Sequence, residues 1–250
     1  MSTIITTWNG LENTKELVES IIKLVKEEYE IIFVDNGSTD GTIKYLKELE
    51  IKNKVIVHTE ALGFSHAVNL GIKEASDKYP IVINNDVVIT KDSLSNLRGS
   101  MERFTEYAIM ASTTDNCGQI LQWFPIKECV KPAIIDAPDV NFICFCIDKS
   151  FWEEHKLDEY YPFGVEDIDL CKTCYLNGRK VGVCLASFVH HKGSQTCVKE
   201  YGEEGLNKNL IKGWEYFAKK FEKNGGKERA QKYLKNKEKL DEYERQKNKL

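Results

Sequence analysis

Three groups of polar side chains border apolar runs and could take part in chemistry. The triplet 84–86, Asn-Asn-Asp, follows one apolar run, and His190 and His191 follow another. Between them, the segment 166–169 holds three acids in four positions. A carboxylate can act as a general base, and carboxylate and imidazole groups can ligate a divalent cation. Each group also has a structural explanation, as a turn, as acids at a helix N-terminus or as polar surface at a strand end.

The polar segment 35–41, Asp-Asn-Gly-Ser-Thr-Asp-Gly, admits three functional interpretations. A calcium loop fails because its twelfth position is Lys47 rather than Glu. A dinucleotide-binding turn fails because no Gly-x-Gly-x-x-Gly follows the first or second expected strand. The third is a nucleotide-binding edge, where Asp35 and Asn36 hydrogen-bond a base or ribose. The structural alternative is an Asx turn that caps the next helix, and we expect residues 38–40 to serve it with or without a ligand.

The elements that must position these groups follow an alternating pattern over the first 120 residues. Strand-length apolar runs alternate with amphipathic segments of helix length, which predicts parallel β-α-β units. We expect strands at 4–7, 31–34, 55–58 and 81–83, and helices at 14–28, 42–49 and 65–75. Ligands of open α/β sheets bind at the carboxyl ends of the strands. The polar residues 7–9, 35–36 and 84–86 should therefore meet at one crevice.

The composition is that of a globular protein. The chain has 250 residues, 42% of them hydrophobic and 30% charged, and a net charge of −4. These values exclude collagen-like, disordered and strongly nucleic-acid-binding classes. No stretch approaches the roughly 18 apolar residues of a membrane span, and the N-terminus lacks a signal-peptide pattern. We therefore expect a cytoplasmic protein.

The eight cysteines are interpreted as reduced thiols. Cys144 and Cys146 stand in a very apolar run, and no signal peptide places the chain in an oxidising compartment. Cys171 and Cys174 form one Cys-x-x-Cys, but a structural zinc site needs a second pair. We expect these two thiols to be packed on a helix.

The last 50 residues differ from the rest of the chain. Residues 201–250 hold 14 Lys or Arg against 9 Asp or Glu, which leaves 21 against 30 in residues 1–200. Leu210, Trp214, Phe217 and Phe221 recur at helical spacing, and a glycine pair, 225–226, follows them. We predict a catalytic domain over 1–200 and a helical, Lys/Glu-rich extension over 201–250. Association of copies through these helices and contact with a membrane surface are further possibilities.

The order of these motifs resembles the inverting glycosyltransferases of family 2, which have the GT-A fold. The resemblance covers residues 3 to 197. Its motifs are Thr7-Trp8-Asn9, the block 34–42, Gly63-Phe64 with Asn69 and Gly71-Ile72, the triplet 84–86, the block 164–170, and His190 with Gly193. The Asp-Asn-Gly-Ser form of the block 34–42, the pair Gly63-Phe64 and the triplet 84–86 look most like the rhamnosyltransferase-like branch. The fold implied is a Rossmann-like, mostly parallel α/β sheet flanked by helices.

The resemblance also implies a role for each matching residue. Thr7, Asn9, Asp35, Asn36, Gly63, Asn69 and Asn85 would hold a nucleotide-sugar. Asp86 corresponds to the last acid of the metal-binding DxD motif for Mn²⁺ or Mg²⁺, and His190, with His191 as alternative, to a further metal ligand. Asp167 corresponds to the catalytic base, and Glu166 is the second candidate.

These roles form one reaction. A nucleoside diphosphate would leave while a divalent cation neutralises its charge, and the base would take the proton of the acceptor hydroxyl. The hydroxyl oxygen would attack the anomeric carbon from the side opposite the leaving group, which inverts the configuration. The sequence departs from the family at Asn84, which replaces the first DxD acid, and at Asn36, where many members have Asp. The donor, dTDP-rhamnose or a UDP-sugar, and the acceptor, a glycan, lipid-linked or other hydroxyl, stay open.

Two other classes of function compete with a transferase. A sugar nucleotidyltransferase would begin with a Gly-rich, basic loop, whereas this chain has Trp-Asn-Gly-Leu at 8–11. A non-catalytic nucleotide-sugar-binding protein would not need the acidic pair 166–167. Several aromatic residues could stack on sugar rings, although core packing is the alternative for most of them; they are Trp123, Phe124, Trp152, Tyr160, Tyr161 and Phe163.

Overall fold

A computed structural model describes residues 1–51, 54–118, 121–123, 133–161, 164–193 and 195–247. The first half of the chain alternates strands and helices as its apolar pattern predicts. These elements are β1 (Ser2–Thr7), α1 (Leu11–Leu24), β2 (Glu30–Asn36), α2 (Thr42–Glu48), β3 (Lys54–Thr59), α3 (Phe64–Glu74) and β4 (Ile81–Asn84). All seven expected elements are present, within a few residues of their predicted bounds.

Helix α1 differs most from its predicted bounds, because it begins at Leu11 rather than at residue 14 and ends at Leu24 rather than at residue 28. Asn9 and Gly10 both adopt positive φ, 56° and 78°, which turns the chain into the helix directly after β1. The Thr14 hydroxyl donates to the Gly10 carbonyl and closes the first turn. An early start of this kind has no signature in the apolar spacing.

The second half of the chain adds strands of both directions. Its elements are β5 (Val87–Ile89), α4 (Ser93–Arg103), β6 (Tyr107–Thr114), β7 (Ile134–Asp136), β8 (Cys144–Ile147), α5 (Lys149–Glu154), α6 (Glu166–Leu176) and β9 (Lys180–His191). Nine strands of the described chain form one sheet in the order β3-β2-β1-β4-β8-β6-β9-β5, with β7 also on β9. Strands β1 to β4 are parallel, whereas β8 runs antiparallel between β4 and β6.

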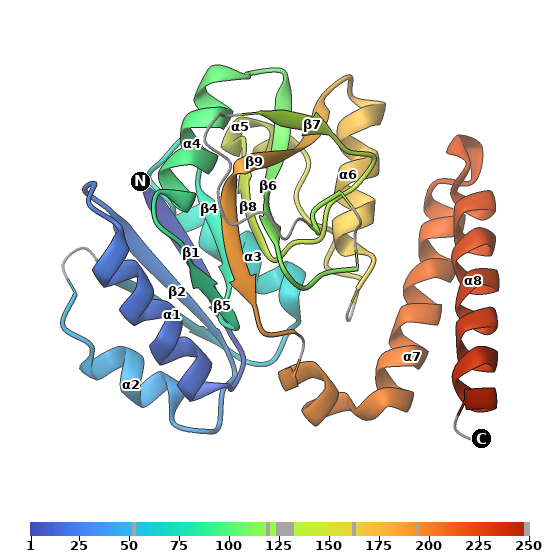
Figure 1. Ribbon diagram of the computed structural model, residues 1–250, viewed down its shortest axis with the longest axis horizontal. Helices are drawn as coiled ribbons and strands as arrows, with labels where there is room; N and C mark the ends of the chain where they lie inside the picture. The colour runs from blue at the N-terminus through green and yellow to red at the C-terminus, as the bar shows by residue number, and fades with distance from the viewer. Residues whose placement is uncertain (52–53, 119–120, 124–132, 162–163, 194, 248–250) are drawn as a thin grey trace.

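Helices cover both faces of this sheet because its strands are apolar on both sides. Ile4 belongs to the core on the α3 and α6 face, and its neighbour Ile5 to the core under α1 and α4. Gly71 lets α3 approach the sheet, since a Cβ there would lie 2.3 Å from Ile4 Cγ2. The predicted mostly parallel α/β sheet flanked by helices is therefore confirmed (Figure 1).

The C-terminal residues form α7 (Gln195–Lys220), a short 3₁₀ turn (Glu222–Asn224) and α8 (Gly226–Lys247). The two helices lie side by side beyond α6 (Figure 1). Trp214, Phe217 and Phe221 are buried against Tyr161 and Val165, as their helical spacing predicts. No helix of the described residues is both long enough and apolar enough to cross a membrane.

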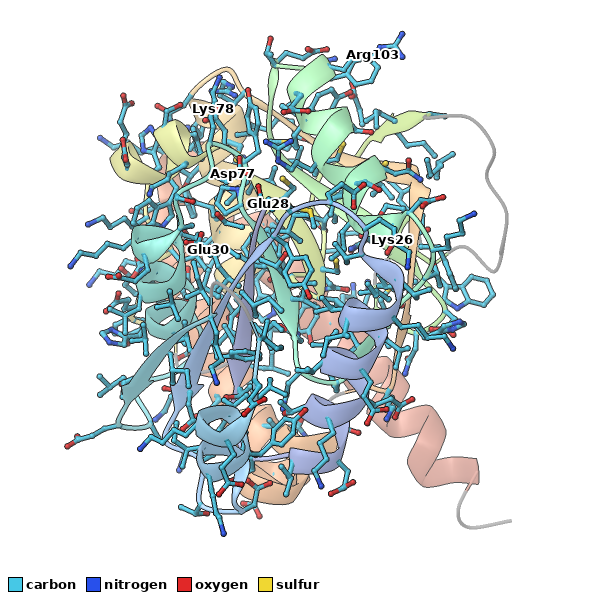
Figure 2. All side chains as sticks on the ribbon, turned by 90° about the vertical axis from the view of Figure 1, so that its left-hand side faces the viewer. Lys26, Glu28, Glu30, Asp77, Lys78 and Arg103 are labelled. Atoms are coloured by element: carbon cyan, nitrogen blue, oxygen red, sulfur yellow. The ribbon has the colours of Figure 1, made fainter. Side chains whose placement is uncertain are left out.

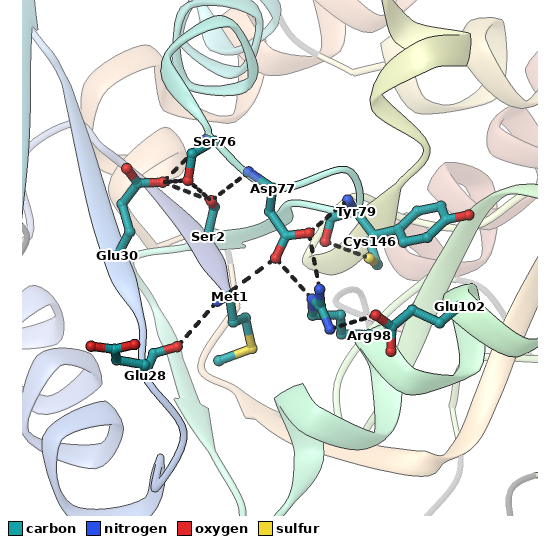
Figure 3. A network of polar contacts seen from close by, with 10 residues as sticks. All are labelled: Met1, Ser2, Glu28, Glu30, Ser76, Asp77, Tyr79, Arg98, Glu102 and Cys146. Carbon is teal, nitrogen blue, oxygen red and sulfur yellow. Dashed lines mark hydrogen bonds and ion pairs between the residues drawn. The ribbon is translucent and has the colours of Figure 1, made fainter.

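A polar network closes the amino-terminal end of the sheet. Figure 2 labels Glu28, Glu30 and Asp77 at this end, and Figure 3 shows how they connect. Arg98 contacts the carboxylate of Asp77 twice, through Nε at 2.8 Å and Nη2 at 3.2 Å. This ion pair links α4 to the loop before β4, and its Asp77 carboxylate is nearly buried.

Cys144, Cys146, Cys171 and Cys174 are buried and stand outside any disulfide. Cys171 and Cys174 are buried on α6, as expected for packing residues. Burial raises the pKa of Cys174 to about 12, so this thiol stays protonated.

Candidate active site

The carboxyl ends of β1, β2 and β4 form one wall of a cavity of about 1150 Å³. Strand register brings them level, because Thr7 pairs with Asp35 and Thr6 pairs with Asn84. Thr7, Asn36 and Asn84 line the cavity. The crevice expected from the strand ends is therefore present.

Two of the predicted nucleotide-sugar ligands lie behind this wall. Asp35 is completely buried, and its carboxylate accepts hydrogen bonds from the Thr7 hydroxyl at 2.9 Å and from the Ser38 amide at 3.0 Å. Asn9 accepts from the Thr39 amide at 2.8 Å. In this structure both side chains hold the loops after β1 and β2 together.

The rest of the 35–41 turn is also held by side chains. Asp40 accepts hydrogen bonds from the Thr42 amide and hydroxyl at the start of α2, which is the predicted Asx turn. It also accepts from the Leu11 amide, which joins the starts of α1 and α2.

Four predicted nucleotide-sugar ligands do line the cavity: Thr7, Asn36, Gly63 and Asn85. The Asn36 side chain accepts from the Leu62 amide at 3.0 Å, which fixes the loop that leads into α3. Gly63, at φ 99°, begins that helix with backbone that few other residues adopt. The Asn85 amide donates to the carbonyl of Asn9 at 2.8 Å and so links the ends of β4 and β1.

Asn69, by contrast, is not among the residues that line the cavity. Its amide group donates to the Leu157 carbonyl and accepts from the Trp152 indole, each at 2.9 Å. It also accepts from the Leu157 amide and donates to Glu159. Both its oxygen and its nitrogen form hydrogen bonds within the fold. Asn69 therefore links α3 to the segment after α5.

Asp86 lies next to His191 rather than His190. His191 Nε2 is 3.3 Å from Asp86 Oδ2, and both residues line the cavity. The other ring nitrogen, Nδ1, is 2.6 Å from the Asn116 carbonyl oxygen, to which it can donate only when protonated. This contact leaves Nε2 on the side of Asp86 and the cavity.

His190 points the other way because successive side chains of a strand alternate between its faces. In β9, His191 stands opposite Val87 and His190 opposite Val88. The His190 ring contacts Asp115, with 2.6 Å between Nδ1 and Oδ2. Asp115 also accepts from the His191 amide at 3.1 Å, so it holds the end of β9.

The pair Asp86 and His191 fits a divalent cation that is shared with a substrate. Asp86 Oδ1 is buried and has no hydrogen-bond partner among the described residues. No set of three or more acidic, His or Cys side chains suited to a metal occurs in the part of the chain that is described. Two protein ligands are enough where phosphate oxygens supply others, as is usual for Mg²⁺.

The second wall of the cavity is the start of α6. Gly164 and Val165 both have positive φ, 74° and 75°, immediately before Glu166 and Asp167. Such a conformation is strained for a β-branched residue and persists only where the surroundings hold it. It turns the first two residues of α6 into the cavity, where both line the wall.

The electrostatic environments of these two acids differ. Burial, with the charge of Asp167, raises the pKa of Glu166 to about 8, and its Oε2 has no partner among the described residues. Burial also raises the pKa of Asp167, but hydrogen bonds from Asn141 at 3.0 Å and from the Ile168 amide at 2.8 Å oppose this rise. The arrangement therefore favours a protonated Glu166 beside an ionised Asp167.

Sequence reasoning did not identify two parts of this site. Asn141, which contacts Asp167, belongs to a loop without a motif. Helix α8 contributes Arg229 and Tyr233 to the cavity, whereas the sequence predicted a helical, Lys/Glu-rich extension and assigned none of its residues to the site. The pairing of Arg229 with the buried Asp139 is the contact that brings α8 to this loop.

The aromatic residues proposed as sugar-stacking groups are dispersed. Trp152 and Tyr161 are buried in the core, whereas Trp123 and Tyr160 are exposed. Tyr160 stacks on Tyr216 of α7, with 3.9 Å between ring centroids. Phe124 and Phe163 lie outside the described residues.

Residues 2–162 match the model of a family described as glycosyl transferase family 2. The chain belongs to glycosyl transferase family 2. Among its relatives is a poly-beta-1,6-N-acetyl-D-glucosamine synthase of Staphylococcus aureus, 27% identical over 196 residues, which are 70% of this chain and 45% of the relative. A dolichol-phosphate mannosyltransferase of Pyrococcus furiosus is 33% identical over 126 residues, 49% of this chain and 36% of the relative. The family 2 chain spans less than half the length of these relatives.

Solved structures share the fold of this family 2 protein. A crystal structure of GalNAc-T7 with UDP, GalNAc and Mn²⁺ matches 76% of the chain and 43% of its own, with a TM-score of 0.65 and 16% identity. A structure of S. aureus TarS 1–349 matches 76% of the chain and 59% of its own, with a TM-score of 0.58 and 19% identity. The GT-A fold expected from the sequence is confirmed.

Proposed function

We propose that this protein transfers a sugar from a nucleoside-diphosphate sugar to an acceptor hydroxyl, with inversion and with Asp167 as the base. The observation that carries the proposal is that Asp167 and the pair Asp86 and His191 line one cavity. A base and a group that can share a cation with a diphosphate are the two functions that such a transfer needs.

Asp167 is the better base of the two neighbouring acids. Its carboxylate is stabilised in the ionised form by Asn141 and by the Ile168 amide, whereas Glu166 is held protonated by burial. A base must be ionised to accept the proton of the acceptor hydroxyl. An ionised Asp167 therefore acts on the acceptor, and Glu166 stays neutral beside it.

Asp86 and His191 would hold Mn²⁺ or Mg²⁺. The bound cation would neutralise the charge that develops on the departing diphosphate. Asn84 stands where the DxD motif has its first acid, and its Oδ1 is also buried without a partner among the described residues. A neutral amide at this position leaves the site with one carboxylate.

Thr7, Asn36, Gly63 and Asn85 line the part of the cavity at the strand ends, and we assign the nucleotide to that part. The resemblance of the sequence motifs to the rhamnosyltransferase-like branch supports dTDP-rhamnose or a UDP-sugar as the donor. The relative that makes poly-beta-1,6-N-acetyl-D-glucosamine supports a role in polysaccharide synthesis. A cytoplasmic location, a catalytic domain over 1–200 and association through the C-terminal helices stay predictions from the sequence.

A panel of UDP-, dTDP- and GDP-sugars, each with and without MnCl₂, tests the proposal. Thermal shift reports binding, and release of free nucleotide reports turnover. We expect one nucleotide class to stabilise the protein more strongly with Mn²⁺ and its sugar to be cleaved. Stabilisation without any nucleotide release in the presence of acceptors would instead support a nucleotide-sugar-binding protein.

A further inference from the structure

Part of the cavity is lined by residues of the C-terminal helices, which lie beyond the residues matched to the family. Trp214 of α7 and Arg229 and Tyr233 of α8 line the same cavity as Asp167, yet the family match ends at residue 162. We use the name C-terminal compartment for the part of the cavity lined by Asn141, Glu166, Trp214, Arg229 and Tyr233.

Helix α7 is fixed to the turn that presents the two acids. A Cβ at Gly213 would lie 3.1 Å from Val165 Cγ2, so this helix and the strained turn are in close contact. Lys220 forms ion pairs with Asp169 of α6 at 2.8 Å and with Asp158 at 2.7 Å. These contacts, with the buried cluster around Trp214 and Phe217, hold α7 against α6.

Two polar groups of this compartment are buried and unused within the described fold. Trp214 is only 2% exposed and Glu166 only 8%, and neither the indole Nε1 nor the carboxyl Oε2 has a hydrogen-bond partner among the described residues. Burial of a polar group without a partner is costly. An indole N–H only donates, whereas a hydroxyl both accepts and donates. Hydroxyl groups of one ligand are therefore able to satisfy each of these groups.

The aromatic surface beside these groups suits a sugar ring. The rings of Trp214 and Tyr233 stack with 4.6 Å between centroids and 25° between planes. Because this stacking covers the sides that face each other and Trp214 is buried, the outer face of the half-buried Tyr233 is the apolar surface left to a ligand. Carbohydrates offer the complementary combination of apolar C–H faces and hydroxyl groups.

The charges around the compartment do not favour an anionic ligand. Helix α8 contributes Glu228, Arg229 and Lys232 to the cavity lining, and the loop before β8 contributes Asp139. The two positive groups are thus matched by two negative ones, and Arg229 is paired with the buried Asp139. Phosphate recognition typically uses unneutralised Arg or Lys groups.

We propose that the C-terminal compartment is the acceptor subsite and binds a neutral, hydroxyl-rich carbohydrate. Trp214 Nε1 donates to an acceptor hydroxyl, Glu166 completes the hydrogen bonds of the same sugar, and Tyr233 packs against its ring. Asp167, adjacent to Glu166, then lies next to the acceptor. This inference rests on the proposed transferase function, because it assigns the second substrate of that reaction.

The test separates acceptor binding from donor binding. Binding to an array of immobilised neutral, carboxylated and phosphorylated oligosaccharides is measured for the full chain and for Trp214→Phe and Tyr233→Ala. Trp214→Phe removes the unpartnered N–H and keeps an aromatic ring. The matched control is Gln231→Ala, an exposed position of α8 that does not line the cavity. Titration with UDP and MnCl₂ follows donor-site binding in every variant.

We expect the wild-type protein to bind neutral oligosaccharides. Both cavity variants should lose at least about tenfold in that affinity, which corresponds to one hydrogen bond or ring contact. The glycan affinity of Gln231→Ala should equal that of the wild type, and the affinity for UDP should be the same in every variant. Preference for phosphorylated oligosaccharides, equal binding by Trp214→Phe and wild type, or no glycan binding beside intact UDP binding would each overturn the acceptor subsite. Failure to bind or cleave any nucleotide-sugar would instead overturn the proposed function.

Discussion

The side-chain amide of Asn141 donates to Asp167 Oδ2 over 3.0 Å, across 26 positions of the chain. This contact joins the loop before β8 to the start of α6. Because a hydrogen bond to an ionised carboxylate stabilises the charged form, it counteracts the rise in pKa that burial imposes on Asp167. Asn141 is therefore a positioning residue whose effect should be visible in pH dependence.

Replacing Asn141 with Leu should raise the pKa of Asp167 and move the acidic limb of the kcat/KM profile to higher pH. A hydrogen bond to a charged group corresponds to about 1–2 pH units. Activity should recover at alkaline pH, where Asp167 is ionised again. A pH–rate profile of nucleotide release from 5 to 9 measures the shift, and a uniform loss of rate with an unmoved limb would show that Asn141 does not set this pKa.

Replacing Asp167 with Asn should lower the turnover of the transfer reaction by about 10²- to 10⁴-fold, the usual contribution of a general base. The amide oxygen can still accept from Asn141, so UDP binding should change little. Glu166→Gln is the matched comparison, because a neutral Glu166 is not expected to take the proton. Near-native turnover by Asp167→Asn, or a larger loss with Glu166→Gln, would contradict the assignment of the base.

The neighbouring histidines provide a paired test of the metal site. His191→Ala removes the ring beside Asp86, whereas His190→Ala removes a ring that contacts Asp115 instead. We expect His191→Ala to raise the Mn²⁺ concentration needed for half-maximal nucleotide release by about 10- to 100-fold. The His190 variant should need about as much Mn²⁺ as wild type, and equal sensitivity of the two would argue against this metal site.

How much of the fold and of the site the sequence predicts depends on how far apart in the chain the interacting residues lie. The alternation of apolar runs and amphipathic segments predicts β1 to β4, because the pattern of each strand lies within a few consecutive residues. The choice between His190 and His191 depends on how β9 pairs with β5, a contact between distant segments. Asn141 and Arg229 reach their partners across 26 and 90 positions, from segments without a motif. Such residues become recognisable only when the fold brings them to the cavity.

Glu166 should make stability depend on pH in an unusual direction. Because its pKa is raised from 4.5 to about 8, the folded protein keeps a proton that the unfolded chain releases. Its contribution to stability is complete below pH 4.5 and is lost as the pH rises through about 8. Glu166→Gln cannot ionise, so it should gain about 1–3 kcal/mol relative to wild type between pH 5 and pH 8.5. Urea unfolding at pH 5 and at pH 8.5 measures the free energy of unfolding of both proteins, and Glu153→Gln at an exposed position is the control. A difference between Glu166→Gln and wild type that is the same at the two pH values would contradict the prediction.

The Arg98 and Asp77 pair should stabilise the amino-terminal end of the sheet. Burial alone would raise the pKa of Asp77, but the hydrogen bonds from Arg98 outweigh it and lower that pKa. Arg98→Met keeps much of the aliphatic packing and leaves a nearly buried carboxylate without its bidentate partner. We expect the free energy of unfolding at pH 7 to fall by about 1–3 kcal/mol. The matched control is Arg103→Met, an exposed position of the same helix. The Arg103 cation faces the Phe104 ring, so we expect this substitution to cost less than about 1 kcal/mol.

The effect of Arg98→Met should also depend on pH. Because Asp77 contributes this stability only while ionised, the cost of Arg98→Met should shrink as the pH falls below 4. Equal costs for the two arginine variants would show that the pair adds nothing beyond surface charge.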